Sequence, residues 1–387
     1  MPHRYSTEDM LAKLVSFNSI SHNSNLPLLD FIEEYLADYG IASTRVYDET
    51  GEKANLYAHI GPMVEGGIIL SGHTDVVPVE DQDWDSDPFV LTERDGRLYG
   101  RGTCDMKGFL ALMLTAVPDM LAANLTAPIQ LAFSYDEESG CLGAPSMIDA
   151  MSKLLPRAKA VIVGEPSMMQ VVNGHKGIIE IETIVHGFAV HSSLVHTGVS
   201  AVTVAARLIM WHVDQMAEGA ANIDPVMSEL GYVPPYTTLH NGVVNGGTVH
   251  NITASECRLL SDIRPIPTQS NESWLKKYRD YVKQVEADIQ KIQPSTKIEV
   301  NLVASTPGLA TETNGMAEQI ARSLTGDNAN HVVSYATEGG QFQEGGYSVV
   351  VCGPGSIEQA HQPNEYIEIS QLLAGEKFIN KIIEHLS

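Results

Sequence analysis

Five residues that can bind a metal ion or carry a proton follow three short apolar runs of this 387-residue chain. They are His73 and Asp75 after the first run, Glu137 and Glu138 after the second, and Glu165 after the third. Neutral imidazole combined with carboxylates suits zinc, cobalt or manganese. Of two adjacent glutamates, one can bind metal while the other moves protons. This set of residue types therefore indicates a metal-dependent catalytic site.

The placement of these residues carries more weight than any single motif. A lone His-x-Asp is more often a structural pair, adjacent glutamates are usually a solvated surface, and Gly-Glu-Pro is usually a turn. In open α/β sheets, however, ligands bind beyond the carboxyl ends of the strands, so separate strand ends can converge on one place. Because His73 and Asp75 face the same way on a strand, we expect the carboxylate to accept the free ring N–H of the imidazole.

Four aliphatic runs predict the strands that position this site, at residues 67–71, 129–134, 160–163 and 348–352. Each is short and is followed by Gly, Pro or acidic residues, which is typical of strands buried on both faces. A long helix is expected soon after Asp105, through the apolar segment 109–116. Strands that alternate with helical patterns indicate an α/β fold with a mainly parallel sheet.

The middle of the chain has another pattern, in the order β-α-β-β-α-β of a ferredoxin-like unit. Its expected segments are strand 178–185, helix 199–216, strands 237–244 and 256–263, helix 274–292 and strand 297–303. We therefore predict an inserted domain at residues 177–304, within a catalytic domain formed by residues 1–176 and 305–387.

The charge balance excludes some classes of partner. The chain has 48 Asp and Glu against 24 Lys and Arg, a formal net charge of −24. Nucleic acids and anionic membranes require a basic surface, so neither is expected as a partner. The N-terminus lacks the apolar core of a signal peptide, and no stretch approaches the ~20 apolar residues of a bilayer span. With four cysteines and no CxxC pair, these features predict a cytoplasmic protein with reduced thiols.

The sequence resembles the acetylornithine deacetylase and succinyl-diaminopimelate desuccinylase family of dinuclear zinc deacylases. The matching motifs occur in the family's order along nearly the whole chain. They are SGHTDVVP at 71–78, YGRGTCDMKG at 99–108, DEE at 136–138, GEP at 164–166, GFAVHSS at 187–193, DIR at 262–264 and GPGSIEQAHQP at 353–363. Within the family, HKG at 175–177 and ATEG at 336–339 are most similar to the acetylornithine deacetylase branch.

The resemblance implies two divalent metal ions, most simply zinc, with cobalt or manganese as alternatives. Asp105 would bridge the ions, His73 and Glu165 would complete one site, and Glu138 and His361 the other. Glu137 would be the general acid/base, and Asp75 would orient His73. Such a pair of ions can polarise a carbonyl and lower the pKa of a bridging water, whose proton Glu137 would pass to the departing amine.

Further roles follow from the same resemblance. The inserted domain would be the dimerisation (lid) domain, and its His191 would reach the active site of the partner subunit and stabilise the tetrahedral oxyanion. Arg264 would bind the substrate carboxylate with help from Asn251. We also hypothesise that Glu338 recognises a cationic side chain such as that of ornithine; the alternative is a hydrogen-bonded turn residue.

These features together predict a cytoplasmic, homodimeric amidohydrolase for a small N-acyl amino acid. The expected reaction removes the acetyl group from N2-acetyl-L-ornithine, giving L-ornithine and acetate in arginine biosynthesis. One alternative is a sibling N-acyl-amino-acid deacylase, a succinyl-diaminopimelate desuccinylase or a dipeptidase that uses the same dinuclear site. Another is a catalytically inactive relative with a binding or regulatory role, which the presence of all five ligands and Glu137 disfavours.

Overall fold

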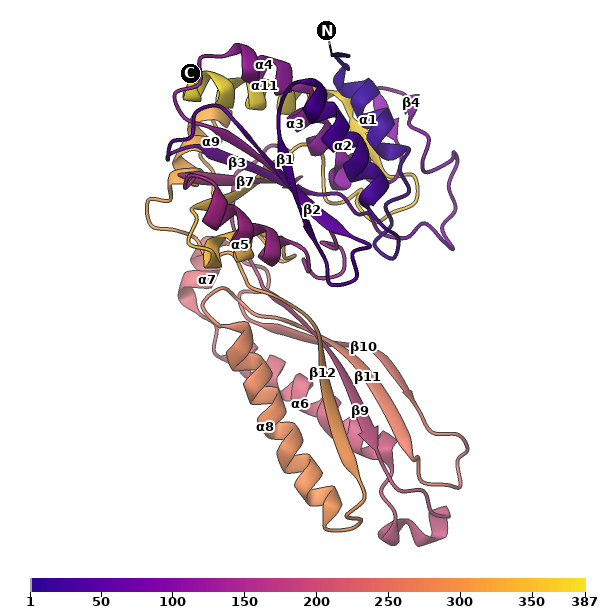
Figure 1. Ribbon diagram of the computed structural model, residues 1–387. Helices are drawn as coiled ribbons and strands as arrows, with labels where there is room; N and C mark the ends of the chain where they lie inside the picture. Colours follow the sequence, from indigo (N-terminus) through magenta and orange to yellow (C-terminus); the bar gives the residue numbers. More distant parts are fainter. Residues whose placement is uncertain (1) are drawn as a thin grey trace. The chain divides into compact units, whose positions relative to one another are not determined.

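A computed structural model describes residues 2–387 of the chain, which form two compact units. The first comprises residues up to Gly174 together with Thr311–His331 and Thr337–Ser387, and the second comprises His175–Ala310 and Val332–Ala336 (Figure 1). No helix within the described residues combines the length and the apolar character that a membrane span needs.

The first unit is built on most of an eight-stranded sheet, of which the last residue of β8 and the last two residues of β13 are assigned to the second unit. In chain order its strands are β1 (Ser43–Tyr47), β2 (Ala54–Ile60), β3 (Ile68–His73), β6 (Ile129–Ser134), β7 (Ala160–Pro166), β8 (Val172–His175), β13 (His331–Val333) and β14 (Val349–Gly353). They lie side by side in the order β1-β2-β6-β3-β7-β14-β8-β13. The adjacent strands β6, β3, β7 and β14 are parallel. These four are the predicted aliphatic runs, and the predicted mainly parallel α/β fold is confirmed.

The register of the parallel strands brings their carboxyl ends to one level. His73 is paired with Ser134 across β3 and β6, and Ser71 is paired with Val163 across β3 and β7. Residues just after position 134 and residue 165 are therefore level with His73. All residues of these three strands are buried, as expected for parallel strands whose sheet is covered on both faces.

Helices and a small sheet complete the first unit. The helices are α1 (Thr7–Val15), α2 (Leu26–Asp38), α3 (Gly108–Thr115), α4 (Val117–Ala122), α5 (Ala144–Leu154), α9 (Met316–Thr325), α10 (Gly339–Glu344) and α11 (Ile369–Leu386). The small sheet has the order β15-β5-β4, formed by β15 (Tyr366–Glu368), β5 (Arg97–Tyr99) and β4 (Thr92–Arg94).

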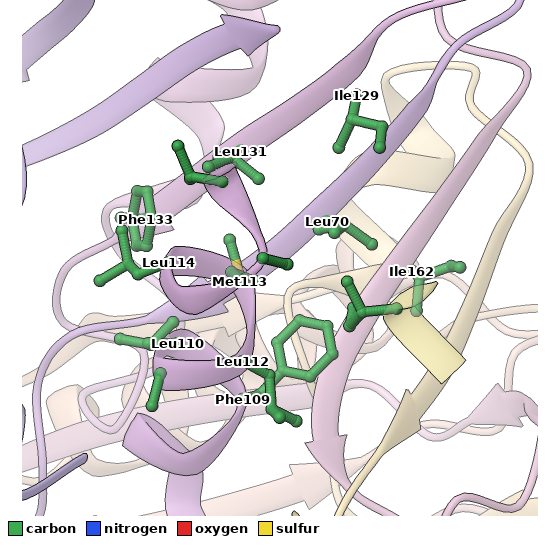
Figure 2. Packing of buried hydrophobic residues seen from close by; sticks show 14 of the residues in the cluster. Leu70, Phe109, Leu110, Leu112, Met113, Leu114, Ile129, Leu131, Phe133 and Ile162 are labelled. Carbon is green, nitrogen blue, oxygen red and sulfur yellow. The ribbon is translucent and has the colours of Figure 1, made fainter. Parts of the chain in front are cut away.

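Helix α3 is the centre of the main core. It is apolar on every side, as expected for a helix without a solvent face, and its residues pack against Leu70, Leu131 and Ile162 of three strands (Figure 2). Phe109 at the start of α3 lies so close to β7 that a Cβ added at Gly164 would come within 2.0 Å of its ring. Glycine is therefore needed beside Glu165 to let the helix approach the strand.

The second unit is an antiparallel sheet with helices on one face (Figure 1). Its strands β9 (Ile178–His186), β10 (Thr238–Gly246), β11 (Glu256–Arg264) and β12 (Lys297–Thr306) have the order β10-β11-β9-β12. Alternate residues of β9 are buried against the long helices α6 (Ala201–Ala221) and α8 (Asn271–Gln290). Besides the predicted β-α-β-β-α-β elements, the structure has the short helices η2 (Ser192–Thr197) and α7 (Pro225–Leu230).

Candidate metal centre

Six side chains of the first unit meet beyond the carboxyl ends of its parallel strands. His73 ends β3, Glu137 and Glu138 follow β6, and Glu165 lies in β7. The other two come from the segment before α3 and from the segment after β14, and they are Asp105 and His361.

Asp105 lies between the two histidines. Its Oδ1 is 2.9 Å from His73 Nε2, and its Oδ2 is 3.3 Å from His361 Nε2. His361 Nε2 is also 2.9 Å from Glu138 Oε2, and His73 Nε2 is 3.6 Å from Glu165 Oε1. One carboxylate that faces two separate sets of donors has the arrangement needed to bridge two metal ions.

The donor set fits divalent cations. Ligand atoms of His73, Glu137 and Glu165 lie within 4.8 Å of one another, as do those of His73, Asp105 and Glu138. Glu138 Oε1 and Glu165 Oε1 are buried without a hydrogen-bond partner. Because buried carboxylate oxygens normally have partners, these two oxygens fit ligands of a cation.

The electrostatics of the cluster point the same way. Burial raises the pKa of Glu138 to about 7 and that of Glu137 to about 8, and Asp105 adds to both shifts. Burial, with Asp105 and Glu137, also raises the pKa of Glu165 well above its ordinary value. Hydrogen bonds to Asp105 and Glu138 raise the pKa of His361 to about 10. Negative charge is therefore in excess at this place, and divalent cations would offset it.

The contacts of Asp75 differ from the prediction. His73 Nδ1 lies 2.9 Å from the main-chain carbonyl oxygen of Asp75, and the carboxylate Oδ1 is farther away, at 3.6 Å. The carboxylate instead accepts hydrogen bonds from the backbone N–H groups of Glu137 and Glu138 and from the hydroxyl of Ser21. Asp75 thus fixes the His73 ring through its backbone and the two glutamates through its side chain.

Glu137 is half-buried on a tightly turned segment. Its Oε1 accepts a hydrogen bond from the thiol of Cys141 at 3.2 Å. Asp136 and Cys141 on either side have positive φ angles of 50° and 53°, a region that side chains other than glycine rarely adopt. Such strain is often found where a side chain is held for catalysis. The sequence offered no signal for this role of Cys141.

The geometry of Glu338 favours a different role from the hypothesised one. Its side chain is 1% exposed, and its two oxygens accept hydrogen bonds from the hydroxyls of Ser71 at 2.5 Å and Ser134 at 2.7 Å. Ser71 lies in β3 and Ser134 in β6, so the carboxylate joins the two strands that lead to His73 and Glu137. A carboxylate with both oxygens engaged in this way is suited to holding strands together.

Three predicted site residues belong to the second unit. Arg264, at the end of β11, has its Nε 3.0 Å from Asp262 Oδ2. His191 is exposed, and its Nδ1 is 2.8 Å from the hydroxyl of Ser193. Asn251 is exposed, and its main-chain carbonyl oxygen accepts a hydrogen bond from the backbone N–H of Ser192.

The sequence profile of peptidase family M20/M25/M40 matches residues 69–385 of the chain. The chain belongs to this family. It is therefore a hydrolase of a metal-dependent kind, and the candidate centre lies inside the matched region. The family resemblance that the motifs indicated is confirmed.

Individual relatives agree with this assignment. The chain is 33% identical over 380 residues to the acetylornithine deacetylase of Myxococcus xanthus, covering 97% of this chain and 96% of that one. It is also 33% identical over 363 residues to the acetylornithine deacetylase of Shigella sonnei, covering 94% and 91%. A solved M20 family metallo-carboxypeptidase from Sulfolobus solfataricus has the same fold, with a TM-score of 0.76, 20% identity, and coverage of 98% and 99%.

Proposed function

We propose that this protein hydrolyses the acetyl amide of N2-acetyl-L-ornithine, releasing L-ornithine and acetate for arginine biosynthesis. The observation that carries the proposal is the match to two acetylornithine deacetylases at 33% identity along at least 94% of the chain. The cluster of histidines and carboxylates in the first unit supports hydrolysis at a metal centre.

Each ligand has a proposed place in the centre. Asp105 would hold both ions, with His73 and Glu165 at one and Glu138 and His361 at the other. Two zinc ions bound there would supply a Lewis acid for the amide carbonyl and lower the pKa of water. Asp75 keeps the His73 ring in place through the 2.9 Å contact with its carbonyl oxygen.

Glu137 is the proposed general acid/base. A base with a pKa near neutrality can take the proton of the attacking water and return it to the departing amine. Burial raises the pKa of Glu137 towards that range. The Cys141 thiol restrains the orientation of the same carboxylate.

The second unit is proposed to complete the site within a homodimer. There His191 of one subunit would stabilise the oxyanion in the site of its partner. Arg264 would bind the substrate carboxylate and Asn251 would assist. The proposed compartment is the cytoplasm, and the proposed substrate is a small, soluble amino-acid derivative.

A deacylation panel tests the proposal. The purified, zinc-loaded protein is assayed with N2-acetylornithine, acetylcitrulline, acetylmethionine and succinyl-diaminopimelate, and kcat/KM is compared. The proposal requires the highest value for acetylornithine. A preference for another of the four substrates would replace acetylornithine by that substrate, and no turnover of any would overturn the assignment.

A further inference from the structure

Arg101 and Glu365 form an ion pair in the interior of the first unit. Arg101 Nη1 lies 2.8 Å from Glu365 Oε2, and each residue is 1% exposed. A buried ion pair is weak evidence for stability, because desolvation of the two charges opposes their attraction. The role of the pair is therefore inferred from the other hydrogen bonds that the two side chains make.

The Glu365 carboxylate holds the segment that ends at Asp105. Its Oε1 accepts the backbone N–H groups of Cys104 at 2.8 Å and Asp105 at 3.0 Å, and its Oε2 accepts that of Gly102 at 3.0 Å. This segment has non-helical backbone angles at Asp105, so it lacks the partners that a regular helix would supply. Glu365 supplies them instead.

Arg101 holds the segment that carries His361. Its Nη1 donates to the carbonyl oxygen of Gln362 at 3.2 Å, and its Nη2 donates to the side-chain oxygen of Gln82. The side-chain amide of Gln82 then donates to the carbonyl oxygen of His361 at 3.0 Å. His361 has a φ angle of 65°, a conformation that persists only where the surroundings hold it.

We propose that Arg101, Glu365 and Gln82 are positioning residues that fix Asp105 and His361 relative to each other in the metal centre. Asp105 and His361 are 256 positions apart in the sequence, and the carboxylate of one contacts the ring of the other. The three residues form a continuous set of hydrogen bonds between the two backbone segments. The inference rests on the metal centre of the proposed function and extends it to residues outside the ligand set.

The test is the binding of Co²⁺ to the full-length, metal-depleted protein. Titration calorimetry measures the affinity, and the visible absorption of the bound ion reports its coordination. Glu365→Gln and Gln82→Ala are each expected to bind cobalt about 10- to 100-fold more weakly than the parent, the usual cost of losing residues that orient metal ligands. Gln82 lies on a partly exposed loop, so Gln82→Ala keeps the test valid if Glu365→Gln does not fold.

Glu318→Gln is the matched control. Glu318 pairs with Arg322 on α9 at 2.9 Å, and Arg322 also donates to backbone carbonyls, but neither residue contacts the metal centre. This variant should bind cobalt with the parent's affinity and spectrum. If Glu365→Gln and Gln82→Ala both do so as well, the positioning role is overturned while the metal centre stands. If the parent itself takes up no cobalt, the metal centre and this inference fall together.

Discussion

Glu137 is the residue on which turnover should depend most. Glu137→Ala is expected to lower kcat by about 10²- to 10⁴-fold, the usual contribution of general acid–base catalysis. The variant should keep its metal, because Glu137 is not among the proposed ligands, which are His73, Asp105, Glu138, Glu165 and His361. Elemental analysis and the deacetylation assay measure the two properties. A variant with the parent's kcat would remove Glu137 from the mechanism, and one that has lost its metal would make Glu137 a ligand.

The two histidines should differ in how much metal each one holds. His73 is buried and belongs to both groups of closely spaced ligand atoms, whereas His361 contacts only Asp105 and Glu138 among them. His73→Ala is therefore expected to lose the ion that it would hold with Glu165 and to bind the ion beside Asp105 and Glu138 more weakly. His361→Ala is expected to retain the ion nearest His73. The zinc content of dialysed protein is the measurement. Equal loss from the two variants would contradict this division of the ligands.

Glu338 allows its two hypothesised roles to be separated. Glu338→Ala leaves the hydroxyls of Ser71 and Ser134 buried without an acceptor, which should lower the free energy of unfolding by about 1–3 kcal/mol per hydroxyl. Glu338→Gln should lose less, because its amide can accept from one hydroxyl and donate to the other. Urea denaturation gives both values. If Glu338→Gln changed the preference for acetylornithine over acetylmethionine, recognition of the cationic side chain would be favoured instead.

Among the elements, the contact between α3 and β7 controls where Glu165 lies. Gly164→Ala would place a Cβ within 2.0 Å of the Phe109 ring, so the helix or the strand must move. The expected loss of stability is about 1–3 kcal/mol, the usual cost of overpacking a core. Weaker zinc binding should accompany it, because Glu165 is the next residue.

Gly219→Ala provides the comparison for this substitution. Gly219 lies within α6, and its added Cβ would meet Tyr236 at an ordinary 3.4 Å. That variant should be as stable as the parent or more stable, because alanine favours the helix. Urea denaturation and zinc titration of both variants are the measurements, and a Gly164→Ala protein with the parent's values would show that the core accommodates the methyl group.

At the scale of the whole molecule, buried histidines link stability to pH. Burial lowers the pKa of His212 to about 4 and that of His175 to about 4, from an ordinary value of 6.5. The unfolded chain therefore binds more protons between these values. Above pH 6.5 the two histidines are neutral in both states and do not reduce the free energy of unfolding. As the pH falls from 6.5 towards about 4, the unfolded chain takes up protons first, and the free energy of unfolding falls.

His212→Gln tests this linkage. The glutamine amide can still donate to Asn241, the present partner of the His212 ring at 2.9 Å, but it does not titrate. The free energy of unfolding of this variant should fall less steeply than that of the parent between pH 6.5 and about 4. Chemical denaturation at a series of pH values measures the slopes, and parallel slopes would show that His212 contributes nothing to the pH dependence.

Much of the molecule was determined by local sequence. Aliphatic runs such as 129–134 became buried strands because their side chains can be buried on both faces of a sheet. The alternation over 178–185 became β9 because alternate side chains of a strand point to opposite faces. His73, Glu138 and Glu165 could be named for a related reason. They lie at or just after the ends of these runs, and the ends of parallel strands meet at one edge of a sheet. Asp105 and His361 do not follow the runs directly and were named from the family resemblance.

Only the tertiary structure decided which groups meet within that site. The Asp75 carboxylate binds two backbone N–H groups beyond another strand, Glu338 joins Ser71 and Ser134, and Glu365 pairs with Arg101 at a separation of 264 positions. No periodicity encodes such contacts, because they depend on how distant segments pack and on which buried polar atoms still need a partner. The sequence by itself determined the donors for a metal centre, and packing determined what holds them in place.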